Sequence, residues 1–96
     1  MSDVVAQYIA ELDAKVRGVI KGTAKLTITD EGSLMLDENG ARAGDEEADV
    51  TLMASDKVFK AILSGDQNPV MAYMSGKLKV DGNAQRALKV SSILTD

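Results

Sequence analysis

Hydrophobic positions along the chain change their spacing several times, and each change predicts a new element of secondary structure. Near the N-terminus, apolar side chains recur every three or four residues: Val5, Ile9, Leu12 and Val16. This spacing is typical of an amphipathic helix that buries one face. Ser2 is placed to cap that helix, and Gly18 or Gly22 to end it.

The next region alternates apolar and polar residues, which is the pattern of strands with one covered face. Between Thr23 and Thr29, for example, every second residue is apolar. The turn sequences DEGS and NG follow, and NG is a strong hairpin signal. These signals predict strands at residues 23–29, 34–38, 41–43 and, after an acidic connection, 48–54.

The last third of the chain mixes helices with one strand, and capping residues or glycines separate them. Ser55, Asn68 and Asn83 are the expected N-caps, because short polar side chains accept hydrogen bonds from the first free N–H groups of a helix. Pro69 suits the first helical position, where its missing N–H is not needed. The expected elements are helices at residues 56–63, 69–75 and 84–94 and a strand at residues 77–81.

The order of these elements predicts the fold class. Consecutive strands early in the chain and mixed elements later are typical of an α+β protein. We therefore expect a five-stranded, mostly antiparallel sheet with helices packed on one face. No linker or low-complexity segment divides the sequence, so residues 1–96 are expected to form a single domain.

Composition and charge exclude several classes of function. With no Cys and no His, the chain lacks thiol nucleophiles, the Ser/His/Asp arrangement and the commonest transition-metal ligands. The net charge of −4 and the 3% aromatic content argue against nucleic-acid binding. No apolar run has the length of a membrane span, and the N-terminus does not read as a secretory signal. We expect a cytoplasmic protein without a cofactor.

The segment from Gly65 to Leu94 carries a family resemblance. It reads GDQNPVMAYMSGKLKVDGNAQRALKVSSIL: a glycine and Asn-Pro before a short aromatic-bearing helix, then GKLK, and GN before an Ala- and Lys-bearing helix. This pattern resembles the signature half of the sterol carrier protein 2 family of lipid-transfer domains. The preceding segment, EADVTLMASDKVFKAIL, also fits, while the first helix and the early strands fit in order and spacing.

The resemblance implies an apolar tunnel between the sheet and the helices. It also implies a lipid ligand (fatty acid, acyl-CoA or sterol), carried without catalysis, and an acyl chain is favoured because a linear tunnel suits it. The residues expected to line the tunnel are Phe59, Ile62, Leu63, Val70, Tyr73, Met74, Leu78, Val80, Ala84, Ala87 and Leu88. Ala84 and Gln85 stand where many members carry Met and Gly, which alters one wall.

Other interpretations of the same residues stay open. The apolar residues are equally consistent with a filled core, which would make the chain a small interaction or accessory domain. A carboxylate-based isomerase would use Asp49, Asp81 or Glu47 in an apolar pocket. Lys77, Lys79 and Lys89 are interpreted as solvated rather than as headgroup ligands, so membrane contact is expected to be transient at most. The oligomeric state is left open.

Overall fold

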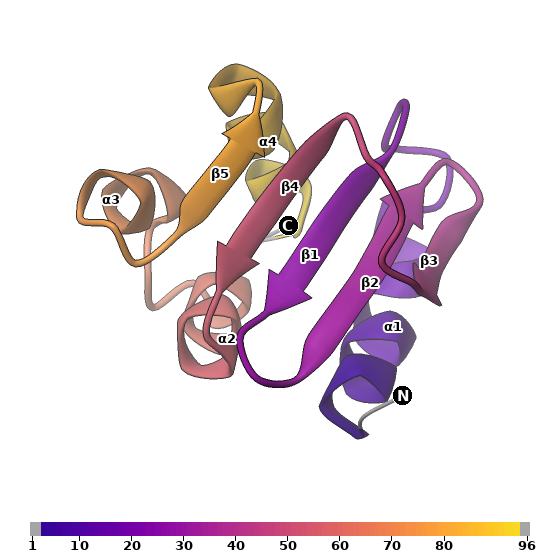
Figure 1. Cartoon of the computed structure of the whole chain (residues 1–96), viewed down its shortest axis with the longest axis horizontal. Coiled ribbons are helices and arrows are strands. Elements are labelled where there is room, and N and C mark those ends of the chain that lie inside the picture. Colours follow the sequence, from indigo (N-terminus) through magenta and orange to yellow (C-terminus); the bar gives the residue numbers. More distant parts are fainter. Residues whose placement is uncertain (1–2, 95–96) are drawn as a thin grey trace.

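The computed structural model describes residues 3–94, and its elements follow the predicted order (Figure 1). The predicted cap Ser2 lies outside the described residues. The helices are α1 (Asp3–Val16), α2 (Asp56–Ser64), α3 (Pro69–Met74) and α4 (Ala84–Leu94). The strands are β1 (Ala24–Ile28), β2 (Gly32–Asp37), β3 (Gly40–Ala43), β4 (Val50–Ala54) and β5 (Lys79–Gly82). The α+β class is confirmed.

The strands form one five-stranded sheet in the order β3-β2-β1-β4-β5. Only the central pair, β1 and β4, is parallel, so the expectation of a mostly antiparallel sheet is confirmed. In Figure 1, α1, α2 and α4 lie behind the sheet, with α1 near β3 and α4 near β4, while α3 lies to the side, beyond β5. The connection from β3 to β4 crosses the opposite face.

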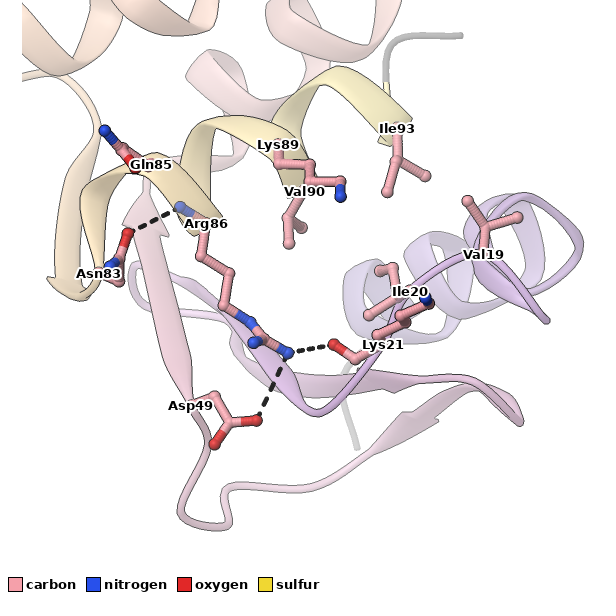
Figure 2. Close-up of a pocket in the computed structure, with 10 residues that line it drawn as sticks. All are labelled: Val19, Ile20, Lys21, Asp49, Asn83, Gln85, Arg86, Lys89, Val90 and Ile93. Atoms are coloured by element: carbon pink, nitrogen blue, oxygen red, sulfur yellow. Dashed lines mark hydrogen bonds and ion pairs between the residues drawn. The ribbon is translucent and has the colours of Figure 1, made fainter.

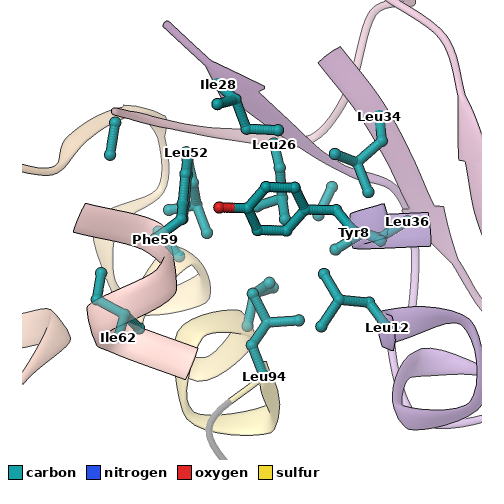
Figure 3. Packing of buried hydrophobic residues seen from close by; sticks show 14 of the residues in the cluster. Tyr8, Leu12, Leu26, Ile28, Leu34, Leu36, Leu52, Phe59, Ile62 and Leu94 are labelled. Atoms are coloured by element: carbon teal, nitrogen blue, oxygen red, sulfur yellow. The ribbon is translucent and has the colours of Figure 1, made fainter. Parts of the chain in front are cut away.

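The core fills the layer between the sheet and the helices (Figure 3). Leu26 on β1 faces Leu34 on β2 and Leu52 on β4, and all three side chains are buried. Tyr8 on α1 and Phe59 on α2 meet edge to face, with ring centroids 6.2 Å apart. Aromatic rings favour this geometry because the positive edge of one ring meets the negative face of the other.

The buried stripe of α1 differs from the prediction at one position. The fully buried residues are Val5, Tyr8, Leu12 and Val16, whereas Ile9 is only half-buried at the margin of the core. The Tyr8 hydroxyl donates to Asp56 Oδ1 at 2.8 Å, which satisfies the polar end of a buried ring. Burial, reinforced by this hydrogen bond, raises the pKa of Tyr8 well above its usual value, and the same bond lowers the pKa of Asp56.

The predicted N-caps are confirmed, but β4 and β5 each begin two residues later than expected, β4 at Val50 rather than at residue 48. Ser55, Asn68 and Asn83 each accept hydrogen bonds from the first turn of the following helix. The strand predicted from Lys77 begins instead at Lys79. The reason is local, because the N–H groups of Lys77 and Leu78 both donate to the Ala72 carbonyl and close α3.

The outer face of the sheet is partly covered by the connection between β3 and β4. Met35 points to this face, since its neighbours on β2 point into the core, yet it is fully buried. Gly44 lies directly over it, and Lys25 Nζ pairs with Asp45 at 2.8 Å. The acidic connection therefore serves as a solvated cover held by ion pairs.

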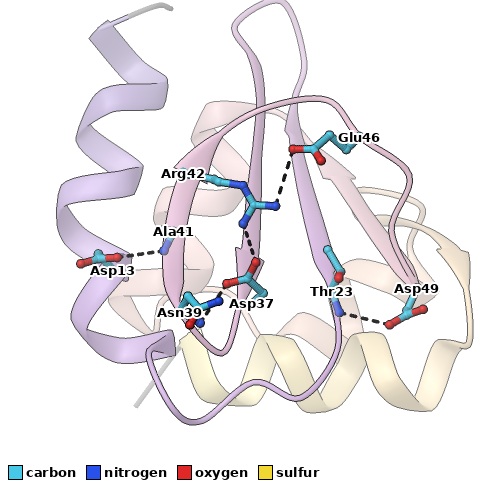
Figure 4. A network of polar contacts seen from close by, with 8 residues as sticks. All are labelled: Asp13, Thr23, Asp37, Asn39, Ala41, Arg42, Glu46 and Asp49. Carbon is cyan, nitrogen blue, oxygen red and sulfur yellow. Dashed lines mark hydrogen bonds and ion pairs between the residues drawn. The ribbon is translucent and has the colours of Figure 1, made fainter.

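A polar network fixes the end of the sheet that holds β3 (Figure 4). Asp13 on α1 accepts from the Ala41 N–H at 2.9 Å, and Arg42 pairs with Asp37 and Glu46. The Arg42 guanidinium holds the pKa of Asp37 below its usual range. These contacts tie α1, the β2–β3 hairpin and the covering connection together.

Candidate functional site

The eleven residues predicted to line a tunnel fall into three groups. Four are buried in the core (Phe59, Ile62, Leu78 and Ala87), four are half-buried (Leu63, Val80, Ala84 and Leu88), and three are exposed (Val70, Tyr73 and Met74). The structure therefore places the first eight between or beside the sheet and the helices. It places the three residues of α3 outside this layer. The enclosed tunnel itself stays a prediction.

An open pocket of about 640 Å³ lies at one end of this layer (Figure 2). It is formed where α4 passes the connection between α1 and β1. Its volume falls within the range of roughly 300–1,000 Å³ that is usual for small-molecule sites. The lining residues are Val19, Ile20, Lys21, Asp49, Asn83, Gln85, Arg86, Lys89, Val90 and Ile93.

The floor of the pocket is aliphatic. Ile20 and Val90 are buried, and Ile93 is half-buried against the same core. Val19 is 52% exposed and stands at the open side. An apolar ligand that covered Val19 and Ile93 would therefore bury apolar surface that is exposed to water in the protein alone.

The rim of the pocket carries more positive than negative charge. Lys21, Arg86 and Lys89 stand against a single carboxylate, Asp49. Arg86 donates to the Lys21 carbonyl, and its guanidinium lies 3.6 Å from Asp49 Oδ2. Because this arginine joins α4 to the α1–β1 connection, it shapes the pocket wall, whereas Lys21 and Lys89 are exposed.

Gly22 is required beneath this bridge. Its φ is 76°, in the left-handed region that favours glycine, and a Cβ there would collide with the Arg86 guanidinium and with the Asp49 carboxylate. Asp49 is further held by the Thr23 N–H, which donates to Oδ2 at 3.1 Å. The α1–β1 connection is thus fixed in place by backbone and side-chain contacts from β4 and α4.

The carboxylates of this region lie at the surface. Glu47, Asp49 and Asp81, the three carboxylates considered for an isomerase, are all exposed, so none is enclosed by apolar side chains. Among residues 3–94, no three His, Cys, Asp or Glu side chains are grouped so that they could hold a metal ion. In the same range, no helix has the length and apolar character needed to cross a membrane.

Sequence reasoning missed most of this pocket. It identified α4 as a ligand-facing helix but chose Ala84, Ala87 and Leu88 rather than Val90 and Ile93. It also assigned no ligand role to Val19, Ile20 and Lys21, which follow the first helix. One signal in the sequence could have indicated this part of the pocket. Val19 and Ile20 are apolar residues in a connection between two glycines, and connections are usually polar.

Comparison with known proteins agrees with the fold and with the motif. Residues 5–95 match the family model described as the SCP-2 sterol transfer family, and the chain belongs to this family. The resemblance noted in the sequence is thereby confirmed.

The chain spans only a small part of the length of a curated relative that it matches. Over 77 residues the chain is 36% identical to "Hydroxysteroid dehydrogenase-like protein 2" of Rattus norvegicus. The match takes in 74% of this chain but only 15% of that protein.

Two solved structures are similar along most of their length. "Sterol Carrier Protein 2 from Yarrowia Lipolytica (apo form)" has a TM-score of 0.70 at 25% identity, and the match covers 97% of this chain and 75% of that one. Sterol Carrier Protein-2 from Aedes aegypti, in complex with palmitate, has a TM-score of 0.77 at 19% identity. That match covers 98% of this chain and 96% of the other, and it shows a shared fold.

Proposed function

We propose that this chain is a non-catalytic, cytoplasmic lipid-binding domain that carries a single-chain lipid with an anionic head, a fatty acid or an acyl-CoA. The observation that carries the proposal is the pocket at α4, with its aliphatic floor and cationic rim, in a member of the SCP-2 sterol transfer family. The Aedes aegypti structure of the same fold, which holds palmitate, supports this class of ligand.

The acyl chain lies against Ile20, Val90 and Ile93, and the head lies near Lys21 and Lys89. Each buried methylene contributes about 0.8 kcal/mol, so a 16-carbon chain gains roughly 12 kcal/mol before the cost of ordering. Ala87 and Leu88 lie within one turn of Val90 on α4. A tail that passes Val90 therefore comes next to these two predicted residues.

The first experiment measures whether the pocket binds lipid. Palmitate should displace a fluorescent fatty acid from the purified protein at micromolar concentrations, and native mass spectrometry should show co-purified lipid. Ile93→Ser removes apolar floor, and it should weaken palmitate binding about tenfold, because about two methylene equivalents of contact are lost.

Ile9→Ser is the matched control. Ile9 is also half-buried against the core, but it lies on α1 and does not line the pocket. Both variants should lose similar stability, while only Ile93→Ser should lose affinity. If the two variants bind palmitate with equal affinity, the pocket is not the lipid site. If the wild-type protein binds no lipid, the proposed function is wrong.

The second experiment tests the anionic head. Lys89→Gln should weaken palmitate binding several-fold and leave the binding of methyl palmitate unchanged, since the ester carries no charge for the ammonium group to meet. The difference between the two ligands should shrink as salt is raised. Equal loss for both ligands would contradict the assignment of the head to the rim, and tighter binding of cholesterol than of either would favour a sterol ligand.

A further inference from the structure

Helix α3 exposes an unusual amount of apolar surface. Six large apolar side chains are exposed among the described residues, and four of them belong to this one six-residue helix. These four define the α3 patch: Val70 (43% exposed), Met71 (61%), Tyr73 (39%) and Met74 (76%). Figure 1 shows α3 at the outer edge of the molecule beside β5. Contiguous patches of this kind mark interaction surfaces more often than scattered apolar residues do.

The helix is capped at both ends, so the exposure does not come from a frayed terminus. Asn68 Oδ1 accepts from the N–H groups of Val70 and Met71, and the Ala72 carbonyl accepts from those of Lys77 and Leu78. Ala72 is fully buried and forms the contact with the rest of the protein.

The direction of the patch follows from helix geometry. At about 100° per residue, Val70 and Met74 point away from Ala72, and Met71 and Tyr73 lie on the two flanks. Ala72, the one small side chain among them, is the residue that faces the protein. The attached helix therefore presents all of its large side chains outward together.

The two charged residues that follow α3 most closely in the chain have the sign that suits an anionic surface. The chain as a whole carries −4, yet Lys77 and Lys79 are the only charged residues between Asp66 and Asp81 in the sequence. Both lysines are exposed. From the sequence these lysines were interpreted as solvated rather than as headgroup ligands, whereas the exposed apolar side chains of the preceding helix favour contact with phosphate headgroups.

We propose that the α3 patch docks this protein on the surface of a bilayer that contains anionic phospholipid. Val70, Met71 and Met74 enter the boundary between headgroups and acyl chains, Tyr73 keeps its hydroxyl at the polar level, and Lys77 and Lys79 meet phosphates. The inference rests on the proposed function to the extent that lipid transfer requires contact with a membrane.

A second copy of the chain fits this surface less well than a bilayer does. Four side chains on one short helix fall far below the roughly 1,200–2,000 Å² that a stable interface buries. A dimer built on the patch also brings the two pairs of lysines toward each other, and it joins two chains of the same net sign. A fluid bilayer adapts to flexible methionines and supplies the opposite charge.

The test is sedimentation of the full chain with vesicles of phosphatidylcholine alone and of phosphatidylcholine with phosphatidylglycerol. The Met71→Gln/Met74→Gln variant should partition about tenfold less into the mixed vesicles. Met53→Gln is the matched control, because Met53 is 41% exposed but lies on β4, outside the α3 patch. The control should partition as the wild type does, and the palmitate affinity of both variants should be unchanged.

A reporter at the patch gives a second measurement. The chain contains no Trp, so Tyr73→Trp places a single indole in the patch, and its emission should shift to the blue only when vesicles are added. Lys77→Gln/Lys79→Gln should abolish the preference for anionic vesicles, which should also fade at high salt in the wild type.

The proposal is overturned if the Met71→Gln/Met74→Gln variant partitions as the wild type does, or if the patch proves to hold a solution dimer that this variant dissociates. Its failure can be told apart from that of the proposed function. If the protein binds palmitate but does not dock on vesicles, only the proposed membrane contact is wrong. If it docks on vesicles but does not bind palmitate, only the proposed carrier function is wrong.

Discussion

Helices α2 and α3 follow each other in the chain and are both rich in apolar residues, yet they are used in opposite ways. Helix α2 turns Phe59 and Ile62 into the core and leaves its charged residues outside. Helix α3 turns only Ala72 inward and leaves its large side chains in water. Apolar content alone does not separate core from surface.

The arrangement of residues around each helix explains the difference. In α2, Asp56, Lys57 and Lys60 provide a polar side, so only one orientation buries the apolar side. Helix α3 has no charged residue, so its sequence does not dictate which face turns inward. The small Ala72 permits close approach at the contact with the core, and the large residues are left for another partner.

The strongest way to test this comparison is Phe59→Ala. This change removes a buried ring and its edge-to-face contact with Tyr8, and it should destabilise the fold by roughly 3–5 kcal/mol. Urea denaturation followed by far-UV circular dichroism measures the loss. A loss below about 1 kcal/mol would mean that α2 does not anchor the core.

Ala72→Leu tests the single inward contact of α3. Ala72 is fully buried, so three added carbons overpack the site and should cost roughly 1–3 kcal/mol. The same denaturation experiment measures the cost. Unchanged stability would show that α3 can move away from the core, and the fixed geometry of the α3 patch would then be wrong.

Tyr8→Phe tests the hydrogen bond that joins α1 to α2. It should cost about 1 kcal/mol at neutral pH, since Asp56 loses its buried donor. The bond lowers the pKa of folded Asp56, so its contribution is present above the unfolded value of about 4 and is lost as the pH falls through the folded value. Stability curves of wild type and variant should therefore converge in acid. A constant difference would contradict the linkage.

Met74→Ala should have the smallest effect. The side chain is 76% exposed, so its truncation should change the free energy of unfolding by no more than about 0.5 kcal/mol. The difference between the losses of unfolding free energy for Phe59→Ala and Met74→Ala, measured in the same buffer, quantifies how differently α2 and α3 contribute to stability. A loss above about 1 kcal/mol would show that Met74 is covered in solution.

Local signals in the sequence predicted the local structure well. Alternation, caps and glycines gave the element order, the fold class and the N-caps at Ser55, Asn68 and Asn83. These features depend on neighbours within a few residues, which is the range over which periodicity and capping act. The late start of β5 escaped prediction, because it depends on two hydrogen bonds to Ala72 rather than on the alternation of Lys77 to Asp81.

The site was harder to predict because it is assembled from distant segments. The bridge from Arg86 to the Lys21 carbonyl joins residues 65 positions apart, and no pattern in either segment signals the other. Val70, Tyr73 and Met74 of α3 were predicted as tunnel lining because the family resemblance implies a tunnel and their apolar side chains suit its wall. Only the burial of Ala72 shows which way that helix turns.

The parallel pairing of β1 with β4 has a consequence for how the chain folds. Strands β1, β2 and β3 are joined by short turns and find one another quickly, whereas Thr23 and Asp49, at the head of the parallel pair, are 26 residues apart. Closing that longer loop lowers the entropy of the chain before the pairing stabilises it. We therefore expect the docking of β4 to limit the refolding rate, so Leu52→Ala should slow refolding. Changes in β5, which can pair only after β4 has docked, should instead mainly hasten unfolding, as stopped-flow kinetics can measure.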